Sequence, residues 1–314
     1  MGEKVLCLGI IVGDFLAKPV EGIPERGKLT LVEKTELHIG GCATNTGIVL
    51  KKLGVDVSIV GKVGNDNLGK FIINKLKEEG INTEYIKISE KFTTSGTSVL
   101  VHSDGERSFI HSIGANADFG LEDIDFSLIK NFSILHIAGP FLMPKFLKEG
   151  LFETLKRAKE NGLITCLDTV WDAFGNWFKG INRSLPYIDY FFTSFEEAKM
   201  ISGKNEKENI CDFFLLNGVK NVCLKMGEKG SYIANKEERY YFPALKVNVV
   251  DTTGAGDGYV AGFIKGIIEK FDFRKSGLLA NIVGAKITTA IGTTSGIKNW
   301  EDLIGFAKKY GYEI

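Results

Sequence analysis

The stretch Asp251-Thr252-Thr253-Gly254-Ala255-Gly256-Asp257-Gly258 decides how the chain is interpreted. An apolar run at residues 247–250 precedes it and predicts a strand. Behind it, apolar residues recur at the spacing of one buried helix face, at Val260, Phe263, Ile264, Ile267 and Ile268. We therefore expect the glycines to form a loop between a strand and the N-terminus of a long helix.

Such a helix N-terminus is suited to bind phosphate. Its backbone N–H groups lack acceptors, the helix dipole is positive there, and glycines allow close approach. Asp257 then has two interpretations. It is either a helix cap or dipole partner, or a general base that acts on a hydroxyl next to a bound phosphate, as a kinase requires. The stretch by itself leaves both open.

Composition favours a small-molecule partner. The 314 residues suffice for one α/β domain with insertions, and acidic and basic residues balance at 39 each, without a long basic run. The chain therefore has no excess positive charge that would attract nucleic acid or an anionic membrane.

Cysteine usage and the N-terminal residues favour a cytoplasmic location. The 5 cysteines show no Cys-x-x-Cys spacing, which predicts reduced thiols. The first apolar run, residues 5–13, is too short to span a membrane and lacks a small-residue cleavage site.

Strand and helix patterns alternate along most of the chain. We expect an α/β fold with a doubly wound, mostly parallel sheet and helices on both of its faces. The strands are expected at 5–10, 57–61, 135–138, 163–167, 190–193, 222–225 and 231–234, and helices at 41–53, 68–76, 146–160, 195–202 and 278–287.

Two segments break this pattern because they carry one polar face. They are residues 28–38 and the hairpin 97–102 and 107–111, with its turn at 103–106. We expect a small separate sheet, inserted in two pieces at about 15–39 and 92–114, that acts as a lid on a single domain spanning 1–314.

Three glycine patterns are not taken as nucleotide motifs. Residues 64–70 and 22–28 resemble a P-loop, but Phe71 and Leu29 stand where Ser or Thr would bind Mg²⁺. Residues 256–261 meet the loose dinucleotide pattern, but their glycines fall inside a helix.

Polar residues near the strand ends are candidates for ligand contact. Asp14 is either a group that grips a polyol or a turn residue, and Asn45 either binds hydroxyls or caps a helix. Gly227 and Gly230 lie in either a nucleotide-facing turn or a plain hairpin.

Together these residues resemble the ribokinase-like (PfkB) carbohydrate kinases over essentially the whole chain. Gly40-Gly41-x-x-x-Asn45 with Leu53-Gly54 is similar to that family's N-terminal signature, and residues 251–257 are similar to its C-terminal one. Supporting matches, in the family's order, are Gly13-Asp14, Val63-Gly64-x-Asp66-x-x-Gly69 and Gly227-Glu-Lys-Gly230.

The resemblance implies transfer of phosphate from ATP to a hydroxyl, expected to be a primary one, of a free sugar or related polyol. Asp257 would be the general base, and backbone N–H groups of 254–257 (Gly254, Ala255, Gly256) the anion hole. Implied contacts are Asp14, Gly41, Asn45 and Asn116 for the substrate and Lys225, Gly227, Gly230 and Asn281 for ATP. Glu197 would act on Mg²⁺ through water, and K⁺, which family members often bind, would map onto Asp251, Thr253 and Ser295.

Two segments depart from the family pattern. Ser194-Phe-Glu-Glu197 replaces Asn-x-x-Glu, and Asp168-Thr-Val-Trp-Asp172 replaces Asp-x-Asn-x-Arg, so that Lys225 is the nearest alternative positive charge. These departures motivate a second hypothesis, a non-catalytic sugar-binding regulator.

The acceptor is the open question. Beyond Arg107 the lid pieces hold no cluster of Lys and Arg, which favours a free sugar over a sugar phosphate, with nucleosides as a further alternative. Family members are often dimers, so a homodimer through the lid is expected.

Overall fold

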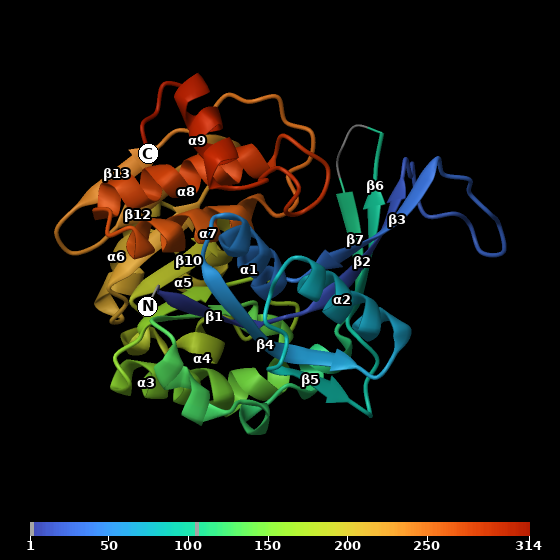
Figure 1. Ribbon diagram of the computed structural model, residues 1–314, viewed down its shortest axis with the longest axis horizontal. Helices are drawn as coiled ribbons and strands as arrows, with labels where there is room; N and C mark the ends of the chain where they lie inside the picture. Colours follow the sequence, from blue (N-terminus) through green and yellow to red (C-terminus); the bar gives the residue numbers. More distant parts are fainter. Residues whose placement is uncertain (1–2, 104–106) are drawn as a thin grey trace.

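The computed structural model describes residues 3–103 and 107–314. Nine strands of the described residues form the main sheet. They are β1 Lys4–Gly9, β4 Asp56–Gly64, β5 Ile86–Ser89, β8 Ile134–Ala138, β9 Ile164–Asp168, β10 Tyr190–Ser194, β11 Asn221–Lys225, β12 Ser231–Ala234 and β13 Arg239–Phe242. Their order is β13-β12-β11-β10-β9-β8-β1-β4-β5 (Figure 1). The strands from β11 to β5 are parallel, while β12 and β13 are antiparallel. The expected mostly parallel sheet is confirmed.

Helices cover both faces of this sheet, so the fold is doubly wound as expected. One face carries α1 Cys42–Lys52, α2 Asn67–Glu78, α7 Ala255–Ile268, α8 Phe273–Ile287 and α9 Trp300–Lys309. The other carries α3 Leu151–Glu160, α4 Trp177–Ile181, α5 Phe195–Ser202 and α6 Lys207–Leu216. Short helical turns lie at Gly114–Asp118, Leu121–Asp123, Phe126–Asn131, Pro140–Leu142, Leu185–Tyr187 and Gly227–Lys229.

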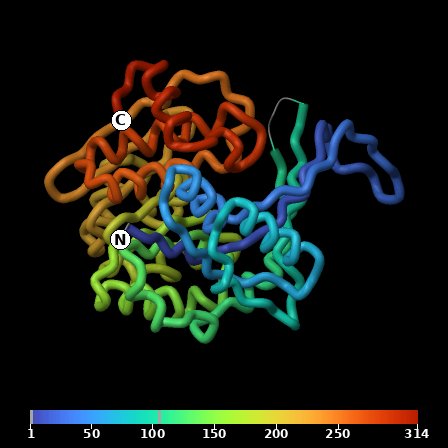
Figure 2. Tube along the Cα trace, in the orientation of Figure 1, coloured from blue at the N-terminus to red at the C-terminus, as the bar shows by residue number. Residues whose placement is uncertain are grey.

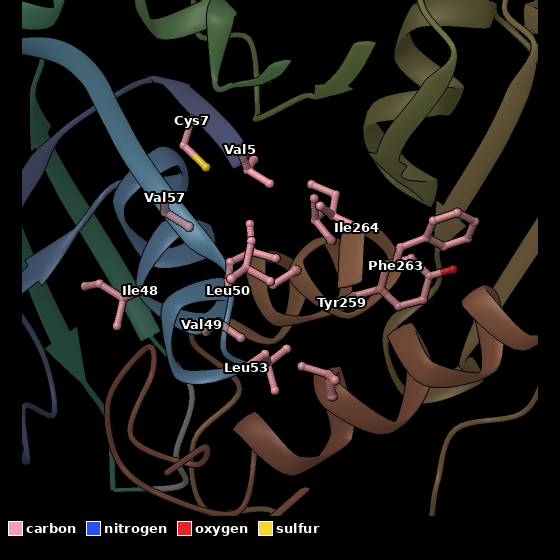
Figure 3. Close-up of a cluster of buried hydrophobic side chains, with 14 of the residues drawn as sticks. Val5, Cys7, Ile48, Val49, Leu50, Leu53, Val57, Tyr259, Phe263 and Ile264 are labelled. Carbon is pink, nitrogen blue, oxygen red and sulfur yellow. The ribbon is translucent and has the colours of Figure 1, made fainter. Parts of the chain in front are cut away.

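Strand alternation divides the core into two parts. In β1, Val5 and Cys7 enter the cluster under α1 and α7, whereas Leu6 and Leu8 enter the cluster under α3 to α6. Figure 3 shows side chains of α1 and α7, among them Leu50 and Ile264, meeting in the first cluster. This contact sets the N-termini of α1 and α7 close together.

A separate small sheet, referred to below by that name, has the order β3-β2-β6-β7. Its strands are β2 Val12–Lys18, β3 Lys34–Gly40, β6 Gly96–Val101 and β7 Arg107–Ser112. It projects from the main body (Figure 1), and the chain between β2 and β3 reaches farthest out (Figure 2). The expected hairpin is formed by β6 and β7, although residues 104–106 of its turn lie outside the described residues.

Two local predictions were wrong. Residues 247–250 form no strand, because Val249 and Val250 are exposed and the Val250 N–H donates to the carbonyl of Thr288, which follows α8, instead of to a neighbouring strand. The strand expected at 28–38 begins only at Lys34. The helix expected at 146–160 is confirmed, with a π-helical first turn, Phe146–Gly150, before α3.

Two general properties complete the description. All five cysteines, Cys7, Cys42, Cys166, Cys211 and Cys223, are free thiols, as the sequence predicted. Within the described residues, the structure contains no helix that combines the length and apolar character needed to cross a membrane.

Candidate active site

The N-terminus of α7 is an open backbone site built on a glycine. Gly254 precedes the helix with φ of 77°, and a Cβ there would lie 2.1 Å from a carbonyl oxygen of the loop after α8. Only glycine fits that position. Among the described residues, the N–H groups of Gly254, Gly256 and Asp257 have no backbone acceptor. The N–H of Ala255, by contrast, donates to the Thr252 carbonyl at 3.2 Å.

Asp257 lies in this first turn and is 8% exposed. Its Oδ2 accepts a hydrogen bond from Asn45 Nδ2 at 2.8 Å. Burial raises the pKa of Asp257, while the bond from Asn45 and the nearby charge of Lys225 partly oppose that rise. Asn45 Oδ1 is buried and has no partner among the described residues, so it remains available as an acceptor.

Asp14 faces the same region from the small sheet. Of its two interpretations, that of a turn residue is wrong, because Asp14 lies within β2, opposite His38 and Thr97. Burial raises its pKa to about 6, the Thr97 hydrogen bond and His38 oppose this, and the Asp257 carboxylate adds to it. Gly40 makes room for this carboxylate, since a Cβ there would lie 1.9 Å from Asp14 Oδ2.

Gly41 and Asn116 have structural partners. Gly41 is the N-cap of α1 with φ of 93°, and a Cβ on it would meet the Ile10 carbonyl oxygen at 2.3 Å. Asn116 is 1% exposed, and its amide accepts from the Ile11 N–H at 3.2 Å and donates to the Ile11 carbonyl at 3.1 Å. Asn116 therefore holds the link between β1 and β2, and its predicted contact with a substrate stays a prediction.

A cavity of about 450 Å³ lies beside the same turn of α7. This volume lies in the range of small-ligand pockets. Its wall includes all four residues predicted to contact ATP, namely Lys225, Gly227, Gly230 and Asn281, together with Ala255 and Gly256 of α7. Apolar side chains between β13 and α7 form another side of it. Neither P-loop-like segment, 22–28 or 64–70, contributes to its wall.

Two of these four residues also have structural roles. Gly230 ends the turn between β11 and β12, and a Cβ there would lie 2.0 Å from the Phe242 carbonyl oxygen. Asn281 Nδ2 donates to the Pro243 carbonyl at 2.8 Å. The turn is thus both a hairpin and part of the cavity wall, so the two interpretations of its glycines are compatible.

Lys225 and Asp168 form a buried ion pair at the edge of this cavity. Lys225 Nζ lies 2.6 Å from Asp168 Oδ1, and the two side chains are 16% and 1% exposed. The neighbouring carboxylates, Asp168 first, raise the pKa of Lys225 against the effect of its burial, so the lysine stays charged. Burial raises the pKa of Asp168, which the charge of Lys225 only partly offsets.

Glu197 is the N3 residue of α5, where its carboxylate completes a capping box. Its Oε2 accepts from the Ser194 N–H at 3.2 Å and from the Thr169 hydroxyl at 2.8 Å. Its charge also acts on Lys225. The serine that replaces the family's usual asparagine therefore keeps the helix cap.

Asp251 joins the loops on either side of Gly254. Its Oδ1 accepts from the Thr253 N–H at 2.7 Å, and its Oδ2 accepts from the Gly292 N–H at 2.8 Å. The Arg107 guanidinium of β7 forms an ion pair with the same Oδ1. Ser295 is exposed in the loop that begins at Gly292. The three residues predicted to bind K⁺ are thus near one another, but Asp251 already has a cationic partner.

The sequence missed two of these contacts. Asp168 and Lys225 lie on strands separated by β10, so no spacing along the chain predicts their pairing. Arg107 lies in β7 and Asp251 in the loop before α7, so they belong to distant regions of the chain. A polar residue at the end of an apolar strand was the available signal for both Asp168 and Lys225.

Comparisons with known proteins agree with this architecture. The family model described as "pfkB family carbohydrate kinase" matches residues 2–300. The chain is 26% identical over 292 residues to the 2-dehydro-3-deoxygluconokinase of Bacillus subtilis, covering 90% of each chain. It is 31% identical over 246 residues to the ATP-dependent 6-phosphofructokinase of Thermoanaerobacterium thermosaccharolyticum, 76% of this chain and 75% of that one.

A solved structure gives the same fold. It is an Escherichia coli protein named as ribokinase II, in complex with ATP and Mg²⁺, which superposes with a TM-score of 0.85. The match covers 98% of this chain and 100% of that chain at 22% identity, so it supports the shared fold.

Proposed function

The chain belongs to the pfkB family of carbohydrate kinases and is an ATP-dependent carbohydrate kinase, and from this premise we propose its acceptor and its catalytic residues. The acceptor is a free sugar or related polyol, phosphorylated on a hydroxyl that we expect to be primary. The observation that carries the proposal is the position of Asp257. It lies in the same first turn of α7 as Ala255 and Gly256, which line the 450 Å³ cavity.

Asp257 acts as the general base. The bond from Asn45 occupies one carboxylate oxygen and leaves the other to take the proton of the attacking hydroxyl. Its raised pKa makes it a better proton acceptor than an exposed aspartate.

The first turn of α7 stabilises the phosphoryl group in the transition state of its transfer. The N–H groups of Gly254, Gly256 and Asp257 are available as donors, with that of Ala255 already directed to a carbonyl. Lys225 adds a full positive charge on the cavity side, fixed in place by Asp168. Lys225, Gly227, Gly230 and Asn281 hold the nucleotide from the cavity wall.

Asp14, Gly41 and Asn45 hold the acceptor, and Asn116 supports them by fixing the chain before β2. The small sheet acts as a lid that excludes water over this site. Its Arg107 is paired with Asp251 and is therefore not free to bind a substrate phosphate. This favours a free sugar, although one relative acts on a sugar phosphate. Nucleosides are the other alternative within the family.

Bound Mg²⁺ would supply positive charge that neutralises the phosphates of ATP. A structural neighbour holds ATP with Mg²⁺, which supports the same requirement here. Glu197 would contact the ion through water. A K⁺ ion at Asp251, Thr253 and Ser295 fits less well, because Arg107 already pairs with Asp251.

We also infer a homodimer through the small sheet in the cytoplasm. Phe15, Leu37 and Ile110 are exposed on one face of that sheet, and an exposed apolar sheet surface favours association. Sedimentation at micromolar concentration distinguishes a dimer from a monomer.

The test is ADP formation from ATP with a panel of sugars, polyols, sugar phosphates and nucleosides. One accepted acceptor should raise ADP formation well above the rate without acceptor, and Asp257→Asn should lower it by about 10²- to 10⁴-fold. Equal rates for the wild type and Asp257→Asn on that acceptor would exclude Asp257 as the base. Sugar binding by calorimetry without ADP formation from any acceptor would favour the sugar-binding regulator instead.

A further inference from the structure

The contact between Arg107 and Asp251 joins the small sheet to the loop that leads into α7. Arg107 begins β7, and its side chain is 11% exposed in contact with Asp251, which is 3% exposed. In Figure 1 the β6–β7 hairpin rises beside the orange and red loops before α7 and after α8. Among the described residues, Arg107 is the one cation paired with this carboxylate.

Asp251 transmits this contact to the anion-binding turn. Its oxygens fix the N–H groups of Thr253 and Gly292, and Gly254 packs against the loop that follows Gly292. The loops that shape the start of α7 are therefore connected through one carboxylate. A carboxylate buried to this degree needs a compensating charge to keep its hydrogen bonds.

The charge state of Asp251 is consistent with that connection. Burial acts to raise the pKa of Asp251, but the bonds from Gly292, Thr253 and Arg107 together lower it. Arg107 also keeps one unused donor, since its buried Nε has no partner among the described residues.

We propose that Arg107 is a positioning residue, through which the small sheet orders the anion-binding turn of α7 by supplying the permanent cation for Asp251. The protein thus carries at this position the charge that a bound monovalent cation would otherwise supply. The kcat of the wild-type enzyme is then the same in Na⁺ and in K⁺. This inference rests on the proposed phosphoryl transfer, but the order of the loop can be measured without it.

The first measurement is amide hydrogen exchange in the full chain. Arg107→Ala should speed exchange at the Thr253 and Gly292 amides by about 10-fold or more, because both bonds end on Asp251. Arg239→Ala is the matched control, since Arg239 pairs with Asp212 on an exposed surface. Unchanged exchange at both amides in Arg107→Ala would overturn the proposal, whatever the activity of the protein.

The second measurement is turnover with an accepted acceptor. Arg107→Ala should lower kcat by about 10- to 100-fold, with the KM for ATP within about twofold of wild type. Added guanidinium ion at millimolar concentration should restore part of kcat in Arg107→Ala and none in Asp257→Asn. Arg107→Lys keeps the charge but loses the planar guanidinium group. Its kcat should lie between those of the wild type and Arg107→Ala.

Each kinetic outcome is decisive. Wild-type kcat in Arg107→Ala, or a wild-type enzyme that K⁺ activates about tenfold over Na⁺, would overturn the proposal. A wild-type protein without turnover on any acceptor would refute the proposed function, while the exchange experiment would still test the connection between Arg107 and the loop.

Discussion

Replacing Lys225 with methionine separates its role in stability from its role in catalysis. Lys225 Nζ lies 2.6 Å from the buried Asp168 carboxylate and near the place where Gly256 enters the cavity wall. Lys225→Met keeps most of the side-chain volume and removes only the charge. Two separate losses are expected, one in folding and one in turnover.

The folding loss follows from the burial of Asp168, which is 1% exposed. Removing one partner of a buried ion pair costs about 3–5 kcal/mol while the other stays ionised. Protonation of Asp168 reduces this loss of folding free energy, since the pKa of Asp168 is already raised to about 7 with the lysine present. A carboxyl with a folded pKa above its unfolded one favours folding less as the pH rises. The free energy of unfolding of Lys225→Met should therefore fall further below wild type at pH 8 than at pH 6.

The catalytic loss follows from the position of the charge at the cavity edge. Removing one preorganised electrostatic contact to a transferring group lowers kcat by about 10²- to 10³-fold, about 2.7–4 kcal/mol. Denaturant unfolding at the two pH values and coupled ADP assays measure both effects.

The double variant Lys225→Met/Asp168→Asn provides the decisive comparison. It should recover most of the stability, because no buried charge is left unpaired, while kcat stays low. Lys220→Met is the control, since Lys220 precedes the same strand, is itself exposed, and pairs with Asp189, which keeps Lys159 as a second partner. Recovery of wild-type kcat in the double variant would refute the catalytic role, as would a wild-type kcat in Lys225→Met.

Three further outcomes are expected. Gly254→Ala places a Cβ 2.1 Å from a carbonyl oxygen, so it should lose about 1–3 kcal/mol in denaturant unfolding and at least about tenfold in kcat. Gly311→Ala, with φ of 81° and no atom within 4 Å, is a control for backbone strain alone, and equal stability loss in both would contradict the reasoning. Asp14 must be ionised to accept bonds from two hydroxyls, so kcat/KM for the acceptor should fall as the pH drops below about 6. A pH profile in which Asp14→Asn keeps that fall would assign it to another group. In Asn45→Ala the pKa of Asp257 should rise, because it loses a hydrogen bond to its charged form, and the acid limb of the kcat profile should move to higher pH. An unmoved acid limb would separate Asn45 from the base.

Local sequence determined the reaction class and most of the elements. The glycine-rich turn at 254–256 could be predicted because a positive φ, close backbone packing and a following apolar helix all leave a signature in neighbouring residues. The parallel strands could be predicted for the same reason, since burial on both faces requires continuous apolar runs. The strand prediction for residues 247–250 was wrong because an apolar run also suits an irregular segment along a cavity. Only the missing strand partner in the folded chain distinguishes the two.

The charge arrangement of the site was decided by the tertiary structure alone. Asp257 with Asn45, Lys225 with Asp168 and Arg107 with Asp251 are pairs whose members are 212, 57 and more than a hundred residues apart in the chain. Each pair forms because strand order and helix packing bring distant residues to the same edge of the sheet. Long-range pairing of single charged side chains has no periodicity, and its energy depends on burial that only the folded chain creates. The sequence therefore predicted a kinase, and the fold determined which charges surround its base.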